Sequence, residues 1–153
     1  MSDERPPSPS ELAGLPLWMQ DAPALADALD GWIQCGVDIL EIDRIEHAVS
    51  RWGTRFLDRV WTVREQRICA GRPSALAARF AGKEAVAKAL GTGLPSHNWL
   101  DIEILRDRMG KPLAFLHGAA RERATLLGIN SLAVSLSHSR TMACAMVVVY
   151  LRK

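Results

Sequence analysis

The sequence predicts an α+β domain in which a mostly antiparallel sheet packs against helices. Strand-like alternation of apolar and polar residues occurs both before and after a central block with helical periodicity. A short turn around Gly110 joins two of the predicted strands as a hairpin. Hydrophobic residues make up 48% and charged residues 24% of the 153-residue chain, which is typical of a globular protein of about one domain.

The domain is predicted to span residues 33–153, after an N-terminal extension over residues 1–32. The extension starts with a Pro/Ser-rich stretch, so we expect part of it to be disordered. It lacks the features of a signal peptide, and the apolar run near residues 142–151 is shorter than the roughly 20 residues of a membrane-spanning helix. The three cysteines have no paired spacing. We therefore expect a cytoplasmic protein with free thiols and no membrane span.

The first part of the domain is predicted to contain one strand, a long helical segment and a short helix. Apolar and polar residues alternate over residues 33–38. An apolar helical stripe follows over residues 45–60, with Gly53 as a point of interruption. Thr62 and Glu65 then have the spacing of a capping box, which predicts the start of a short helix.

An alanine-rich helix is predicted over residues 75–90, with Ser74 as its N-cap and Gly91 as its C-terminal cap. The last strand is so apolar that we expect it to be buried on both faces. The remaining predicted elements are strands over residues 100–105, 113–116, 132–137 and 142–150 and a helix over residues 118–127.

Two carboxylates lie among apolar or small residues, where a charged group needs a partner. Asp38 interrupts the apolar end of the first strand, although it could also be the N-cap of the next helix. Glu84 falls on or beside the packed face of the alanine-rich helix, and a surface salt bridge with Lys88 would also explain it. A pair of carboxylates suits Mg²⁺, which commonly takes one or two of them together with substrate phosphates.

Two turns carry groups that suit phosphates. Residues 91–93 read Gly-Thr-Gly after the helix, and glycines let backbone N–H groups approach an anion, although a helix cap explains them equally. Residues 135–140 combine three serines with a histidine and an arginine at a strand end, either as an anion-binding rim or as a polar hairpin turn. With the carboxylates, these features indicate a metal-assisted reaction on a phosphorylated substrate.

A stripe of arginines at positions 51, 55 and 59, preceded by Arg44, suggests either a docking surface for an acidic partner or a solvated helix face. The net charge is only +2, and basic and aromatic residues do not interleave on any predicted strand. Both observations argue against a nucleic-acid-binding domain.

Several segments, taken in order, resemble the holo-acyl-carrier-protein synthases, which are small phosphopantetheinyl transferases. The resemblance covers about residues 36–150. Gly82 departs from it by replacing an alanine, Trp61 by replacing a leucine, and Leu40 by standing where two-lobed relatives often have a carboxylate. The matching segments are Gly36-Val37-Asp38-Ile39, Arg79-Phe80-Ala81-Gly82-Lys83-Glu84-Ala85, Lys88-Ala89-Leu90-Gly91-Thr92-Gly93, Asp101-Ile102-Glu103, Gly110-Lys111-Pro112 and Ser135-Leu136-Ser137-His138-Ser139.

The resemblance implies an enzyme that transfers the phosphopantetheine group of coenzyme A to a serine of an apo acyl carrier protein and releases adenosine bisphosphate. Asp38 and Glu84 would hold Mg²⁺, and Lys88 would neutralise charge on the leaving group. Glu84 or a metal-bound water is the candidate base. The implied coenzyme A site comprises Arg79, Lys83, Lys88, Gly91, Thr92, Gly93, Ser137 and His138.

Arg44, Arg51 and Arg55 would bind the acidic carrier protein, whether that of fatty acid biosynthesis or a polyketide or other specialised one. The resemblance further implies a homotrimer whose active sites are shared between neighbouring subunits. A non-catalytic relative that binds coenzyme A or the carrier protein as an assembly or regulatory subunit is the alternative. The joint presence of Asp38, Glu84 and Lys88 argues against that alternative.

Overall fold

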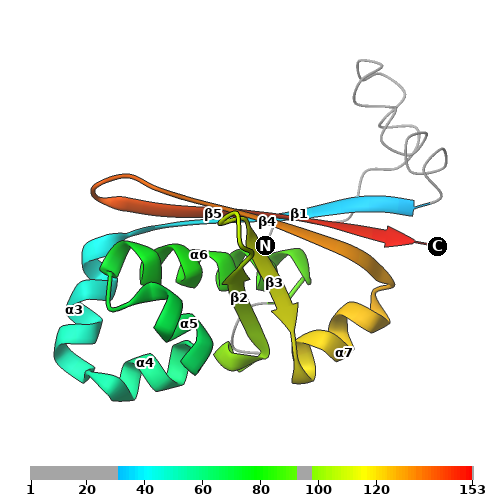
Figure 1. Cartoon of the computed structure of the whole chain (residues 1–153). Coiled ribbons are helices and arrows are strands. Elements are labelled where there is room, and N and C mark those ends of the chain that lie inside the picture. Colours follow the sequence, from blue (N-terminus) through cyan, green and yellow to red (C-terminus); the bar gives the residue numbers. More distant parts are fainter. Residues whose placement is uncertain (1–30, 93–97, 153) are drawn as a thin grey trace, which may run out of the picture.

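The computed structural model describes residues 31–92 and 98–152, so most of the predicted extension over residues 1–32 lies outside the described residues. Figure 1 shows the arrangement of the elements. In chain order they are β1 (Gly31–Glu41), α3 (Ile42–Trp52), α4 (Thr54–Val60), α5 (Val63–Cys69), α6 (Pro73–Ala89), the 3-10 helix η2 (Trp99–Asp101), β2 (Ile102–Arg106), β3 (Pro112–Leu116), α7 (Gly118–Leu126), β4 (Ile129–His138) and β5 (Met142–Arg152).

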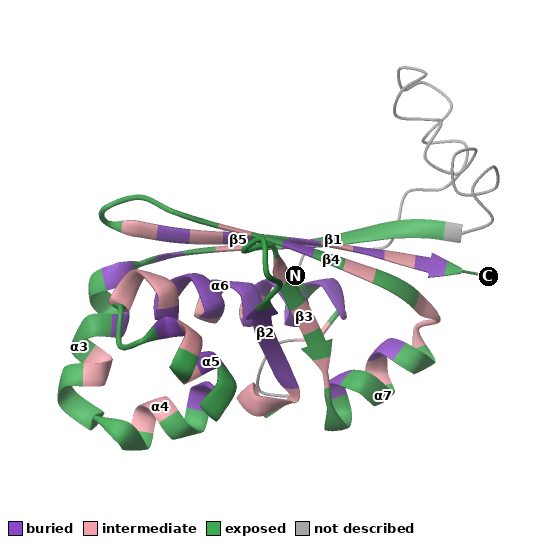
Figure 2. Cartoon of the chain, viewed as in Figure 1, coloured by how far each residue is buried: buried purple, intermediate pink, exposed green. Residues whose placement is uncertain are grey.

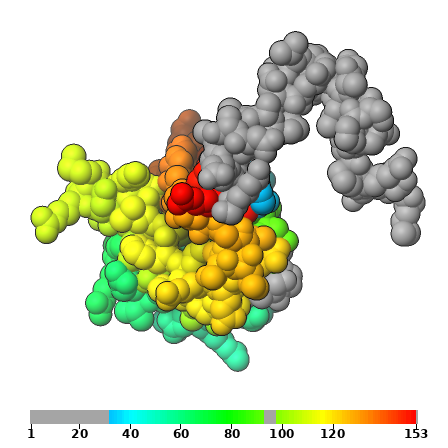
Figure 3. All heavy atoms as spheres, turned by 90° about the vertical axis from the view of Figure 1, so that its right-hand side faces the viewer, coloured from blue at the N-terminus to red at the C-terminus, as the bar shows by residue number. Residues whose placement is uncertain are grey.

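The described strands form two antiparallel sheets, which confirms the predicted α+β class but divides the expected sheet in two. The larger sheet has the order β1-β5-β4, and the smaller one pairs β2 with β3. The end of β5 lies beside the start of β1, with Arg152 paired to Gly31. The turn between β2 and β3 projects from the body of the molecule (Figure 3).

The helices lie on one side of the three-stranded sheet, and α6 runs along that side as the centre of the core (Figure 1). Eleven of the residues of α6 are buried. Gly36 brings β1 against the α6 backbone, and Gly82 receives side chains from β2 and β4. The two glycines therefore permit close packing on two sides of α6.

The opposite face of this sheet is exposed, as the green bands in Figure 2 show. Val37 and Ile39 on β1 are 63% and 64% exposed, and Met146 on β5 is also exposed. The prediction that the last strand is buried on both faces was therefore wrong: alternate residues of β5 face α6, and the others face outward. In the described part of the chain, no helix is long and apolar enough to cross a bilayer.

Local sequence signals account for most element boundaries. Thr62 and Glu65 form the predicted capping box at the start of α5. Gly53, with a φ of 57°, separates α3 from α4 and confirms the predicted interruption. Ser74 is not the N-cap of α6: the helix starts at Pro73, two residues before the predicted start, with Arg72 as its N-cap. The fixed φ of Pro73 suits a first helical position.

Candidate active site

Asp38 and Lys88 form an ion pair where β1 crosses α6. The Lys88 Nζ donates to Asp38 Oδ1 at 2.8 Å and to the Val37 carbonyl oxygen at 2.9 Å. The side chain of Asp38 is 18% exposed and that of Lys88 is 50% exposed. The N-cap of α3 is Glu41, so the structure does not support the N-cap alternative for Asp38.

Glu84 lies one turn before Lys88 on α6 and is half-buried. Burial raises the pKa of Glu84, the charge of Asp38 raises it further, and Lys88 acts in the opposite direction. Asp38 and Glu84 line the same cavity, so the two carboxylates are near enough to repel each other. The structure therefore brings together Asp38, Glu84 and Lys88, as predicted from the sequence.

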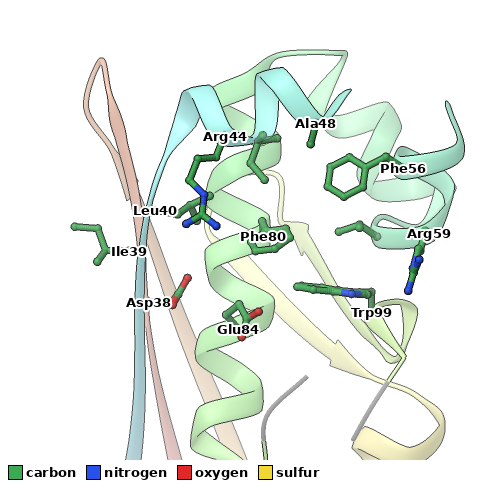
Figure 4. Close-up of a pocket in the computed structure, with 12 residues that line it drawn as sticks. Asp38, Ile39, Leu40, Arg44, Ala48, Phe56, Arg59, Phe80, Glu84 and Trp99 are labelled. Atoms are coloured by element: carbon green, nitrogen blue, oxygen red, sulfur yellow. The ribbon is translucent and has the colours of Figure 1, made fainter. Parts of the chain in front are cut away.

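These carboxylates open into a cleft of about 480 Å³ between β1, α6 and the α3–α4 pair. Figure 4 shows Asp38 and Glu84 toward one end of the cleft and Arg59 with Trp99 toward the other. Arg44 of α3 also lines the cleft. The cleft thus combines two acidic oxygen donors, arginines and an apolar lining.

The donors in this cleft fit a hard cation that keeps several of its own ligands. Among residues 31–92 and 98–152, no group of three or more His, Cys, Asp or Glu side chains is arranged to hold a metal ion. Mg²⁺ does not require such a group, because it is commonly held by one or two carboxylates with water and substrate phosphates. A cation bound between Asp38 and Glu84 would relieve the mutual repulsion of the two carboxylates.

Lys83 does not reach this cleft, although the sequence placed it in the coenzyme A site. Its ammonium is fully buried and donates to Glu65 Oε2 at 2.8 Å, to the Trp99 carbonyl at 2.9 Å and to the Ile102 carbonyl. Burial lowers the pKa of Lys83, and Glu65 acts in the opposite direction. All three N–H donors of the ammonium have partners, which gives Lys83 a structural role in joining α6 to α5 and β2.

Arg79 and His138 line a smaller hollow of about 210 Å³ near the N-terminal end of α6. The buried Arg79 donates through Nε to the Ile104 carbonyl and through Nη1 to the Ala75 carbonyl. Arg72 and Arg106 line the same hollow. Three guanidinium groups and a helix N-terminus create a positive potential that suits a phosphate.

The other predicted coenzyme A residues are arranged less favourably. Ser137 pairs with Cys144 and His138 with Ala143, so their side chains point to opposite faces of the sheet. The backbone N–H groups of Gly91 and Thr92 donate to the carbonyls of Lys88 and Ala87. These donors close the C-terminus of α6, so the structure supports the helix-cap alternative for this turn and not the phosphate-binding one. Gly93 lies outside the described residues.

The predicted docking arginines lie on α3 and α4. Arg51 stacks over the ring of Trp52, with 4.9 Å between its Cζ and the ring centroid. Arg55 and Arg59 line a shallow hollow of about 400 Å³ together with Trp52 and Phe56. This surface is continuous with the cleft, because Phe56 and Arg59 line both.

The sequence analysis missed the aromatic lining of the cleft and two arginines of the smaller hollow. Phe80 stacks on Trp99 with ring centroids 4.5 Å apart. Phe80 lies four residues before Glu84. This spacing places both side chains on one helix face, so it could have indicated an aromatic lining beside Glu84. Arg106 comes from β2, so no local pattern indicates that it meets Arg79, whereas Arg72 is the N-cap of α6, about two helical turns before Arg79, and its spacing could have indicated it.

Comparisons with known proteins identify the family of the chain. The sequence pattern of the 4′-phosphopantetheinyl transferase superfamily matches residues 34–145. The chain is 54% identical over 120 residues to the holo-[acyl-carrier-protein] synthase of Herpetosiphon aurantiacus, covering 74% of this chain and 94% of that protein.

Two solved structures show the same fold. The holo-[acyl-carrier-protein] synthase of Helicobacter pylori in complex with coenzyme A matches with a TM-score of 0.69 and 38% identity, covering 75% of this chain and 98% of that one. The Bacillus anthracis synthase in complex with CoA (3′,5′-ADP) matches with a TM-score of 0.63 and 32% identity, covering 77% and 96%. The chain belongs to the 4′-phosphopantetheinyl transferase superfamily, as an enzyme of its holo-[acyl-carrier-protein] synthase family.

Proposed function

We propose that this enzyme transfers the phosphopantetheine group of coenzyme A to a serine of an apo acyl carrier protein, with Mg²⁺, and releases adenosine 3′,5′-bisphosphate. The observation that carries the proposal is that Asp38 and Glu84 line one cleft, with Lys88 paired to Asp38. The relatives that bind coenzyme A or its bisphosphate support the choice of substrate and product.

Asp38 and Glu84 are the residues that would hold the cation. Bound there, Mg²⁺ would supply Lewis-acid polarisation of the diphosphate oxygens. Lys88 is half-exposed and pairs with Asp38, which lines the cleft, so its ammonium can contact a phosphate and neutralise the charge that develops on the leaving group. The hollow lined by Arg72, Arg79 and His138 would bind the nucleotide phosphates.

The active site is proposed to be shared between neighbouring chains of a homotrimer. Asp38 and Glu84 lie where β1 packs on α6, whereas His138 lies on β4, at the other edge of the sheet. Because α6 fills the space between them, a neighbouring chain could bring its own His138 hollow to the Asp38 cleft. Such a contact joins two different surfaces and closes as a ring. The exposed apolar sheet face around Val37 and Ile39 offers the buried area that a ring would need.

The carrier protein would dock on the α3–α4 surface that carries Arg44, Arg51 and Arg55. This surface borders the cleft, so a carrier bound there would present its serine near the Asp38–Glu84 pair. Arginines beside exposed Trp52 suit an acidic partner with some apolar residues. The proposed location of the reaction is the cytoplasm, which agrees with the three free cysteines.

Mass spectrometry of an apo acyl carrier protein after incubation with the enzyme, coenzyme A and Mg²⁺ tests the proposed reaction. We expect the mass of one phosphopantetheine to be added, and the addition to be lost with EDTA or in the E84A variant. Transfer that survives in a folded E84A variant would contradict the metal assignment. Absence of transfer to fatty-acid, polyketide and other carrier proteins would contradict the proposed function.

Subunit mixing tests whether the site is shared. We expect E84A and H138A to be impaired as pure proteins and to recover about a quarter of the wild-type activity after joint refolding, because one combination of neighbours in four joins two intact halves. A lack of recovery, with both variants folded and the mixed oligomers verified, would mean that each site lies within one chain.

A further inference from the structure

Gly36 lets strand β1 touch the backbone of α6 directly. A methyl group at position 36 would overlap the carbonyl oxygen of Ala85 and approach the amide nitrogen of Ala89 to 2.8 Å. Both atoms belong to the helix backbone, so no side chain could move aside to make room. An alanine at this position would have to separate the two elements by on the order of 1 Å, because protein interiors are close-packed.

Helix α6 has little freedom to retreat from such a methyl group. Gly82 is itself in close contact with Ile104 of β2, in the smaller sheet, as well as with Leu136 of β4, in the same sheet as β1. Lys83 further ties α6 to Glu65 of α5 through a fully buried ion pair. The separation of β1 and α6 is therefore fixed from both sides of the helix.

The same separation fixes the two carboxylates. Asp38 lies two residues after Gly36 and so shares its face of β1. Glu84 immediately precedes Ala85, whose carbonyl Gly36 meets. A shift of β1 away from α6 would carry Asp38 away from Glu84.

We propose that Gly36 is a positioning residue that holds the Asp38–Glu84 pair at a span that selects a small divalent cation. This inference rests on the metal pair of the proposed function and adds the reason for its choice of cation. Mg²⁺ demands near-ideal octahedral geometry with oxygen ligands at about 2.0–2.1 Å, whereas Ca²⁺ accepts flexible coordination at about 2.3–2.6 Å. A wider pair would therefore lose more affinity for Mg²⁺ than for Ca²⁺.

Competition for Mn²⁺ measures this preference without relying on activity. The electron paramagnetic resonance signal of free Mn²⁺ reports how much of that ion the protein binds, and Mg²⁺ or Ca²⁺ is then added as a competitor. In the G36A variant we expect Mg²⁺ to compete about tenfold less well. Ca²⁺ should lose less than about threefold, so that the Mg²⁺/Ca²⁺ ratio falls.

The G82A variant is the matched control, since it adds the same methyl group to α6 on the side of Ile104 and Leu136. We expect G82A to unfold at a lower temperature but to keep the wild-type cation ratio. The E84D variant covers the case in which G36A does not fold. It widens the pair by shortening one side chain and leaves the β1–α6 contact intact, so its ratio should fall in the same direction.

The results separate this inference from the function on which it rests. An unchanged cation ratio in folded G36A, or in E84D if G36A does not fold, would overturn the role of Gly36 while leaving the metal pair in place. Mn²⁺ binding that is insensitive to both D38N and E84Q would overturn the metal pair itself, and the role of Gly36 with it. A lower ratio in the tested variant with a wild-type ratio in G82A would support the proposal.

Discussion

Helix α6 carries two lysines that form ion pairs of the same length in opposite surroundings. The distance from Nζ to the carboxylate is 2.8 Å both for Lys83 with Glu65 and for Lys88 with Asp38. The first pair is fully buried, whereas the Lys88 side chain is half-exposed and its partner Asp38 lines the cleft. Burial, and not distance, therefore distinguishes a pair that joins elements of the fold from one that can exchange its partner for a substrate.

The largest effect on stability is expected from breaking the buried pair. K83M removes the ammonium and leaves the Glu65 carboxylate buried without its cation, which should lower the free energy of unfolding by about 3–5 kcal/mol. Urea denaturation followed by circular dichroism measures the change. A loss below about 1 kcal/mol would mean that Glu65 readily finds other partners and that the pair is not needed for the fold.

The next largest effect is expected from a charge reversal on the proposed docking surface. R44E is expected to raise the KM for the carrier protein about tenfold at low salt, because it replaces attraction to an acidic partner by repulsion. The difference from wild type should shrink as salt is added. R121E on α7 is the control with the same change of charge, and an equal effect of both variants would argue against a specific docking surface.

A smaller effect, on the unfolding temperature, is expected from neutralising Glu84. Its pKa is raised by burial and by Asp38, so the folded chain holds this proton more tightly than the unfolded chain. The ionised carboxylate therefore lowers stability at neutral pH, and that loss disappears as the pH falls below the pKa of the unfolded state. E84Q should unfold at a higher temperature than wild type at neutral pH, with no such difference in acid.

Thermal unfolding at both pH values checks this sign, with E122Q on α7 as an exposed control. The same raised pKa predicts that transfer declines in acid sooner than an ordinary glutamate would require, because protonated Glu84 no longer binds a cation. A lower midpoint of E84Q at neutral pH would contradict the account of this carboxylate.

The smallest effect on stability is expected at the exposed pair. K88M should change the free energy of unfolding by less than about 1 kcal/mol, because a partly exposed ion pair is screened by solvent. It is the matched control for K83M, with the same substitution on the same helix. A loss as large as that of K83M would give Lys88 a structural role as well.

Local patterns predicted the elements better than they predicted the contacts. The capping box at Thr62 and Glu65 and the break at Gly53 depend on neighbouring residues, so the sequence was enough to find them. The buried contacts of Lys83 are with Glu65, which lies 18 residues away, and with carbonyl groups of a later segment. The resemblance placed both Lys83 and Lys88 in the coenzyme A site, but only Lys88 pairs with Asp38, which lines the cleft.

In the candidate site, too, some features could be predicted and others could not. The resemblance to a family predicted that Asp38 and Glu84 would meet, although they come from different elements. It also placed Gly91 and Thr92 in the coenzyme A site, whereas their N–H groups close α6, as the local prediction of a cap at Gly91 had indicated. The resemblance could not predict the close approach at Gly36 either. A side chain is excluded there by the backbone of a helix about fifty residues away in the sequence.

Measuring transfer per folded molecule in K83M and K88M tests most directly whether the exposed pair serves the reaction and the buried pair serves the fold. The product is counted by mass spectrometry, and the folded fraction is set by circular dichroism under the same conditions. We predict that K88M is fully folded and about 10²–10³-fold slower, as expected for the loss of a charge that stabilises the transition state. K83M should keep the wild-type rate per folded molecule. A K88M variant with the wild-type rate would contradict the account.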